Sequence, residues 1–177
     1  SIVFRRGILD KDNNLKMMRI GDSIDKAEVL HKMMFNKKRI LSKLAEMHTL
    51  DIYSSILLDL PDIFEYSVFK NLLKKELENP DINKEKKEAF EEVLWVMNSF
   101  YDIQFKHDSD ISERVIFPIA EAESRGIEDA RFVRFTDDDG SESVIGTYTA
   151  YNGHAILPKL ITTEDFYTFR VMPLYGE

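Results

Sequence analysis

The chain has 177 residues, of which 44% are hydrophobic and 32% are charged, so it can bury a core in one or two domains. The net charge of −8 argues against nucleic acid or an anionic membrane as the main partner, and the lack of cysteine excludes disulfides and thiolate chemistry. No apolar run approaches the roughly 18 residues of a membrane-spanning helix, and no signal-peptide pattern starts the chain, so we expect a cytoplasmic protein.

The first 22 residues predict a β-hairpin. Residues 2–9 and 15–20 are strand-like and flank an Asp/Asn-rich turn at 10–14. Because an isolated hairpin is marginally stable in water, these strands need partner strands from elsewhere.

Residues 23–105 predict a helical segment. Ser23 suits a helix N-cap, and apolar residues recur at helical spacing up to position 45. We expect a second helix at 65–78, ended by Pro80, and a third from about 83 to 101.

Strand signals return from residue 106. Residues 131–135 and 143–149 flank the turn 136–140 as a second hairpin, and 155–161 and 169–174 each predict one more strand. The expected fold class is mixed α and β, a β-sheet unit interrupted by a helical insertion.

The hexapeptide Gly-Ile-Glu-Asp-Ala-Arg at 126–131 sets two adjacent acids beside an arginine, directly before a strand. A carboxyl group that is desolvated at a strand edge can act as a general acid while a nearby arginine keeps its neighbour ionised. Glu128, Asp129 and Arg131 could equally form a structural ion-pair network at a loop-to-strand junction. The residue types alone leave both interpretations open.

This hexapeptide belongs to an ordered series of motifs. The others are Ser-Glu-Arg-Val-Ile-Phe-Pro at 112–118, Gly-Thr-Tyr-Thr-Ala-Tyr-Asn-Gly at 146–153 and Thr-Glu-Asp-Phe at 163–166. The series resembles the β-mannoside phosphorylases of glycoside hydrolase family 130, whose signature is Gly-x-Glu-Asp-Pro-Arg. Ala130 stands here in place of the commoner proline.

The resemblance implies part of a five-bladed β-propeller with antiparallel blades. Residues 1–22 would then be a hairpin of the propeller, 23–105 an inserted helical subdomain, and 106–177 a blade segment that carries the motif. A full propeller needs more strands than this chain offers, so the chain would be an internal piece of a longer enzyme, inactive when isolated. Ser1 in place of methionine fits that expectation.

The resemblance also implies inverting phosphorolysis of β-mannosides with Asp129 as the general acid. Inorganic phosphate is the co-substrate, and no other cofactor is expected. Phosphate is already an anionic nucleophile, so one protein acid is enough, whereas inverting hydrolysis needs a second carboxylate as base. A β-mannoside hydrolase of the same family is the alternative. The expected partners are an oligosaccharide and phosphate.

The expected substrate-binding residues are Glu128, Arg131, Tyr148 and Tyr151. Tyrosine rings can stack on a sugar, but strand alternation places Tyr148 and Thr149 on opposite faces, so only one of them can line a pocket. Packing of the sheet is an equally good explanation for these aromatic residues.

No metal site is predicted. The histidines lack the spacing of metal ligands, and the acidic run 137–142 lacks the alternating ligands of an EF-hand loop, which favours a solvated turn. These histidines are His31, His48, His107 and His154.

The helical segment 23–105 could be a lid, an oligomerisation surface or a structural insertion. A homo-oligomer therefore stays open. Trp95 tests these alternatives, because a partner surface would expose it and a helical core would bury it. The competing class is a non-catalytic protein, either a carbohydrate-binding protein that keeps the motif structurally or an interaction module centred on the helices.

Overall fold

The computed structural model describes residues 1–30, 34–38, 40–41, 56–57 and 60–174. The chain forms two compact units. Unit 1 combines Ser1–Leu30 with Ser99–Glu177, and unit 2 is the intervening segment His31–Asn98. The separate unit is therefore shorter than the helical segment expected at 23–105, because both ends of that segment belong to unit 1.

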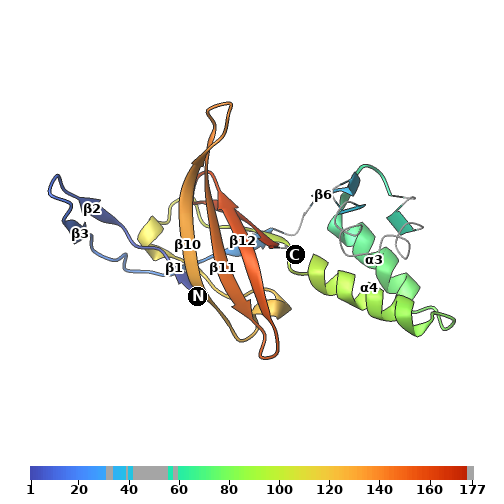
Figure 1. Ribbon diagram of the computed structural model, residues 1–177. Helices are drawn as coiled ribbons and strands as arrows, with labels where there is room; N and C mark the ends of the chain where they lie inside the picture. Colours follow the sequence, from blue (N-terminus) through green and yellow to red (C-terminus); the bar gives the residue numbers. More distant parts are fainter. Residues whose placement is uncertain (31–33, 39, 42–55, 58–59, 175–177) are drawn as a thin grey trace. The chain divides into compact units, whose positions relative to one another are not determined.

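Unit 1 is built on a six-stranded antiparallel sheet (Figure 1). Its strands, in spatial order, are β10 (Gly126–Thr136), β11 (Glu142–Tyr151), β12 (Ile156–Thr163), β13 (Thr168–Pro173), β8 (Tyr101–Gln104) and β5 (Glu28–Leu30). The turn after β10 closes because the backbone N–H of Asp137 donates to the carbonyl of Ser141 at 2.9 Å. Gly140 in that turn has φ +84°, an angle that glycine adopts without strain.

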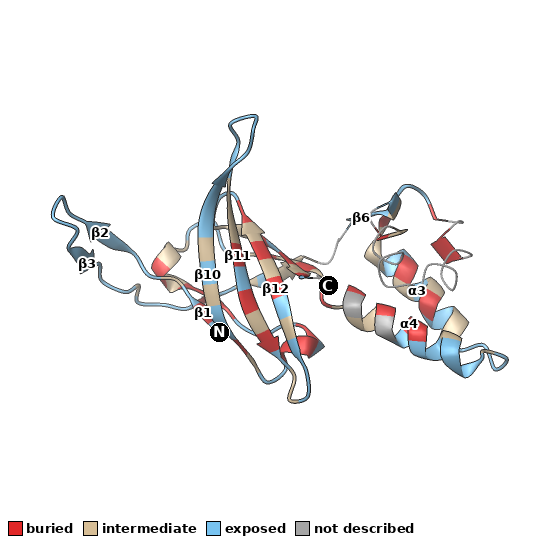
Figure 2. Ribbon diagram, viewed as in Figure 1, coloured by how far each residue is buried: buried red, intermediate tan, exposed pale blue. Residues whose placement is uncertain are grey.

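The two faces of this sheet differ in burial because side chains alternate along each strand (Figure 2). One face packs on the core of unit 1 and carries Ile103, Tyr148, Ala150, Ile161, Phe169 and Val171. The opposite face, which we call the outer face, carries Glu128, Arg131, Thr147, Thr149, Tyr151 and Arg170. Phe132 belongs to the core-facing set, and its ring occupies the space where a Cβ on Gly146 would lie, 2.5 Å away.

A smaller sheet joins the start of the chain to the motif at 112–118. It consists of β1 (Ile2–Val3), β9 (Arg114–Ile116) and β4 (Asp25–Lys26), with β9 in the middle. The short 3₁₀ turns η1 (Ile111–Glu113) and η2 (Glu121–Glu123) precede β9 and β10. Phe4 follows β1 and packs its ring 5.5 Å from that of Phe169, which connects this sheet to the core.

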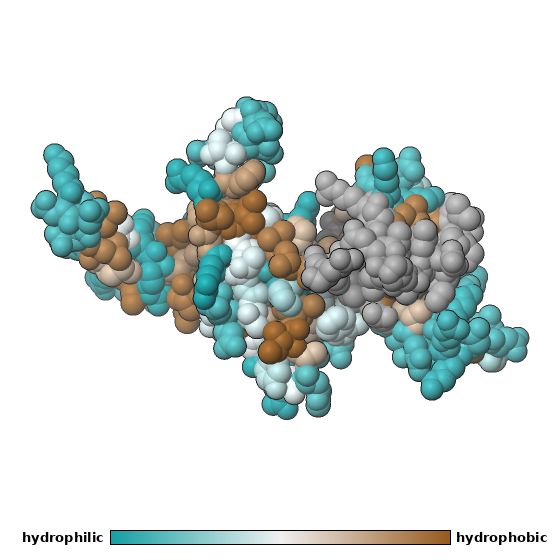
Figure 3. Space-filling view, viewed as in Figure 1, coloured by the Kyte–Doolittle hydropathy of each residue, from teal (hydrophilic) through white to brown (hydrophobic). Residues whose placement is uncertain are grey.

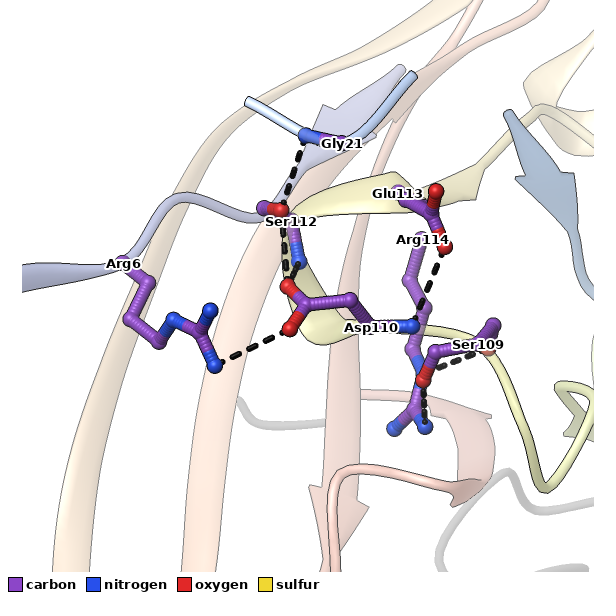
Figure 4. Close-up of polar contacts among 7 residues, drawn as sticks. All are labelled: Arg6, Gly21, Ser109, Asp110, Ser112, Glu113 and Arg114. Carbon is purple, nitrogen blue, oxygen red and sulfur yellow. Dashed lines mark hydrogen bonds and ion pairs between the residues drawn. The ribbon is translucent and has the colours of Figure 1, made fainter. Parts of the chain in front are cut away.

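A polar cluster at η1 fixes this connection (Figure 4). Asp110 accepts hydrogen bonds from the backbone N–H and the hydroxyl of Ser112 at 2.9 and 2.7 Å, which holds the pKa of Asp110 below its usual value. Its other oxygen pairs with Arg6 at 2.9 Å. Arg114 is buried and donates to both the hydroxyl and the carbonyl of Ser109. The segment 112–118 therefore has a structural role here.

Residues 5–20 form a protruding hairpin that we call the arm. Its strands are β2 (Gly7–Leu9) and β3 (Leu15–Met17), and all six of their residues are exposed. The Asp10 carboxylate accepts from the backbone N–H of Asp12 and of Asn14 at 2.9 and 2.8 Å, and Asn13 adopts φ 62°. The predicted hairpin is confirmed, but its first strand is divided, because residues 2–3 pair with β9 instead.

Unit 2 contains β6 (Met34–Asn36), β7 (Ile63–Glu65), α3 (Tyr66–Leu77) and α4 (Lys84–Met97). Asn83 caps α4, since its side-chain oxygen accepts from the backbone N–H of Lys86 at 2.8 Å. Pro80 lies between the two helices, as expected from its inability to continue a helix. The apolar stripes pack a small core of Phe64, Phe69, Leu73, Phe90 and Val93.

The predicted five-bladed β-propeller is wrong. The described strands form sheets of six, three, two and two strands, and none of these sheets closes or repeats as a blade. A propeller requires four-stranded blades repeated around a channel. The long sheet instead forms because β8 and β5, from outside the predicted blade segment, extend β10–β13 on one side. Mixed α and β content remains, with sheet predominating in the described chain.

The helix predicted from Ser23 is also wrong over its first half. Residues 25–36 contribute β4, β5 and β6, because their apolar residues pack in sheets rather than along one helical face. Positions 42–45 of that helix lie outside the described residues. The helices predicted at 65–78 and from 83 are confirmed, although the second ends at Met97 and Tyr101 begins β8. Among the described residues, no helix combines the length and the apolar character that crossing a bilayer requires.

Candidate functional site

The hexapeptide lies at an irregularity in β10. The pairing of β10 with β11 shifts between Glu128 and Arg131, so Asp129 and Ala130 form a β-bulge. Asp129 adopts φ 55°, which is uncommon for a residue other than glycine. Bulges and strained backbone angles are enriched next to functional sites, where they redirect a side chain. The sequence indicated a strand edge here but gave no sign of the bulge.

The carboxylate of Asp129 is paired with Arg131. The guanidinium donates to Oδ1 from Nε at 3.2 Å and from Nη2 at 3.1 Å, and Nη2 also lies 3.1 Å from Oδ2. The two side chains are 62% and 77% exposed, so water competes with this ion pair and its contribution to stability is about 0–1 kcal/mol. Asp129 is thus accessible to water, not desolvated as the general-acid interpretation expected, and its carboxylate already has a partner.

The sheet brings some of the predicted substrate-binding residues together and separates others. Glu128 pairs with Thr149 and Arg131 with Thr147, and alternation puts Tyr151 on that same outer face. The Tyr151 side chain is exposed, and its hydroxyl donates to the carbonyl of Gly153 at 2.9 Å.

Tyr148, by contrast, is 2% exposed and lies on the core face. In this arrangement it cannot touch a ligand on the outer face.

Comparison of the chain with protein-family models, curated proteins and solved structures finds no match. What the site can do must therefore be argued from its own residues.

The outer face also carries a concave region. A cavity of about 470 Å³ is lined by Asp102, Ser143, Ile145, Thr162, Glu164 and Arg170, among others. Arg170 and Asp102 form a two-point ion pair with both contacts at 3.0 Å. The lining is rich in hydroxyl groups, which suits polyhydroxylated ligands. Asp129 does not line this cavity.

A buried charged network was missed by the sequence analysis. Glu123 and Lys159 are both 0% exposed, and the Lys159 ammonium lies 3.5 Å from Oε1 of Glu123. The same Oε1 accepts from the hydroxyls of Tyr101 and Tyr148 at 2.8 and 2.7 Å. Lys159 also donates to the carbonyl of Ser99 at 2.6 Å.

This network fixes the segment before β10, because Oε2 of Glu123 accepts from the backbone N–H of Ile119 and of Ala120 at 2.8 and 3.1 Å. Burial lowers the pKa of Lys159 to about 8, against the opposing effect of the Glu123 charge. Burial and the same charge raise the pKa of Tyr101 far above its usual value. The available signal was a lysine at a core-facing position of β12, between Leu157 and Ile161.

Among the described residues, no group of three or more His, Asp or Glu side chains is arranged to hold a metal ion. His107 stacks on Tyr167 with ring centroids 3.9 Å apart, and His154 is exposed in the turn after β11. His31 and His48 lie outside the described residues. Trp95, the residue chosen to separate a partner surface from a helical core, is half-buried in α4.

Proposed function

We propose that this protein cleaves β-mannosides or related glycosides, and that Asp129 donates the proton to the departing glycosidic oxygen. The observation that carries the proposal is an exposed carboxylate at a β-bulge with φ 55°, inside the Gly-Ile-Glu-Asp-Ala-Arg segment. The exposed ion pair with Arg131 adds little stability, so the Asp129 carboxylate can exchange this partner for a ligand at small cost.

The proposed reaction is phosphorolysis with inversion. Inorganic phosphate forms a bond to the anomeric carbon as the bond from that carbon to the glycosidic oxygen breaks. The proton of Asp129 goes to this oxygen, which leaves as an alcohol, and the carboxylate then regains a proton from solvent. Hydrolysis differs only in that water, activated by a second carboxylate, replaces phosphate.

Two features of the outer face support a sugar ligand. Tyr151 offers an exposed ring one pair along the sheet from Glu128. Hydroxyl groups from Thr149 and Thr147 lie opposite Glu128 and Arg131. Arg131 holds Asp129 in place in the unliganded protein. Proton donation requires the carboxyl group to leave the guanidinium, which a bound sugar hydroxyl can bring about by competing for either partner.

The test uses the full-length protein as wild type and as Asp129→Asn, incubated with β-linked mannosides with and without inorganic phosphate. Asp138→Asn is the matched control, because it removes an exposed aspartate from the turn of the same hairpin. We expect phosphate-dependent release of mannose 1-phosphate by the wild type and the control, and at least a ~100-fold lower rate for Asp129→Asn.

Release of free mannose without phosphate, lost in Asp129→Asn, would keep the acid and change the reaction to hydrolysis. Turnover that Asp129→Asn leaves unchanged, or no turnover of any glycoside by the wild type, would refute the proposal.

A non-catalytic glycan-binding protein is the second candidate. It is favoured by the three hydrogen bonds that already occupy the Asp129 carboxylate. This candidate predicts that wild type and Asp129→Asn bind mannosides in calorimetry without turnover, and that Tyr151→Ala abolishes the binding.

A further inference from the structure

The arm of residues 5–20 exposes an apolar surface to water, which carries a free-energy cost. In its register, Leu9 faces Leu15 and Gly7 faces Met17, so one side of the hairpin is entirely apolar. Leu9, Leu15 and Met17 are 62%, 64% and 52% exposed. An isolated two-stranded hairpin is marginal in water, and three such side chains on one face need a covering surface.

A second exposed apolar surface lies at the distal end of the β10–β11 hairpin. Val133, Phe135 and Ile145 share the outer face there, and the first two are 63% and 48% exposed. We call these three residues the receiving face. Beside them, β10 ends the six-stranded sheet, so no further described strand pairs with its outer edge.

The two surfaces have opposite charge. Residues 5–20 carry five Lys/Arg against two Asp, but Arg6 and Arg19 form ion pairs with Asp110 and Asp22 of the same chain, which leaves a net charge of +1. Residues 133–143 carry one Arg against four Asp/Glu, a net charge of −3. Figure 3 shows the same arrangement in both hairpins, a hydrophilic tip that adjoins an apolar body. Complementary charge around matching apolar surfaces is the pattern of a specific contact.

We propose that the arm of one molecule packs on the receiving face of a second copy of this chain, and that two copies exchange arms reciprocally. Each chain supplies both surfaces, and a two-fold arrangement is the one that closes at two copies instead of continuing as an open chain. The two-fold axis places each arm on the receiving face of the other copy, so neither apolar surface stays exposed. The arm is formed in advance for this contact, since Asp10 and Asn13 fix its turn locally, which limits the ordering entropy of association.

The experiment measures the mass of the full chain by sedimentation velocity from about 1 to 100 µM, where weak homodimers dissociate. The first variants are Leu15→Ser in the arm and Phe135→Ser in the receiving face. Both residues are exposed, so neither change opens a cavity, and circular dichroism verifies folding. We expect each variant to raise the dimer dissociation constant at least ~10-fold.

Ile8→Ser is the matched control. Ile8 is 58% exposed in the same hairpin but pairs with Lys16 on the opposite side of the arm, so the dimer should persist. Mixing Leu15→Ser with Phe135→Ser is the decisive step. The mixed dimer has one intact contact and one contact that lacks both side chains. Because Leu15 and Phe135 meet in the proposed contact, losing both costs less than the sum of the single losses, and we expect the mixture to dimerise more tightly than either variant alone.

Four results would overturn the proposal. The wild type could remain monomeric across the range, Ile8→Ser could weaken the dimer as much as Leu15→Ser, or the mixture could associate no better than its components. A dimer unaffected by both first variants would use other surfaces and would equally refute reciprocal arm exchange.

Discussion

The buried network of Glu123 and Lys159 allows the most detailed prediction. Replacing Lys159 with methionine removes a fully buried ammonium 3.5 Å from the Glu123 carboxylate and keeps a side chain of similar length. Removing one partner of a buried ion pair costs about 3–5 kcal/mol, because the remaining charge is left without its counter-ion.

The structure places Lys159→Met at the lower end of that range. The Glu123 carboxylate keeps four hydrogen bonds, from two tyrosine hydroxyls and two backbone N–H groups. We therefore expect a loss of about 3 kcal/mol, or roughly 6–12 °C in melting temperature for a chain of this size. Glu123→Gln should cost more, about 5 kcal/mol, since it disturbs these four bonds as well as the ion pair.

The assay is hydrogen–deuterium exchange of peptides from β11 and β12, which contain two members of the network. Trp95, the only tryptophan, lies in unit 2, so its fluorescence reports on the other unit. The double variant Lys159→Met/Glu123→Gln should lose at least about 2 kcal/mol less than the sum of the single losses. A cost below about 1 kcal/mol for Lys159→Met, or a larger cost for Lys159→Met than for Glu123→Gln, would refute the reasoning.

Three further predictions concern unit 1. Burial lowers the pKa of Lys159 to about 8 in the folded chain, whereas an unfolded lysine titrates at about 10.4, so the folded state gains stability as pH rises from 8 towards 10. The neutral amine removes the cost of a buried charge and keeps its hydrogen bond to the Ser99 carbonyl, which methionine lacks. Urea titrations should therefore show the wild type gaining about 2 kcal/mol over Lys159→Met across that window, and no relative gain would contradict the lowered pKa. Asp129→Gly should be neutral or stabilising by up to about 1 kcal/mol, because glycine adopts φ 55° without strain. Asp129→Val should cost about 1–2 kcal/mol, because a β-branched residue is strained at that angle. Equal unfolding midpoints for the two variants would argue against backbone strain. Gly146→Ala should cost about 1–3 kcal/mol in thermal melts, since its Cβ would lie 2.5 Å from the Phe132 ring, and the double variant with Phe132→Leu should recover part of the loss.

The candidate site shows how far sequence reasoning reaches. Residue types and spacing singled out the acidic pair and the arginine, and alternation placed Tyr148 and Thr149 on opposite faces of a strand. It did not show which of them is buried, and Tyr148, predicted to bind substrate, lies in the core. The bulge was not predictable, because it depends on how β10 aligns with β11 over their whole length. The role of Asp129 stays a prediction until the variant is assayed.

The sequence by itself determined the hairpins and two helices of this protein, but not the strands between residues 25 and 36. Turn residues between alternating segments specified the two hairpins, and apolar spacing with Asn83 and Pro80 specified α3 and α4. These features depend on interactions between residues close in the chain. Tertiary structure alone decided that β8 and β5 extend the large sheet, that no propeller blade forms, and that Lys159 meets Glu123 in the core. The physical reason is that such pairings join distant segments, and their register is set by packing of the whole core rather than by any local pattern.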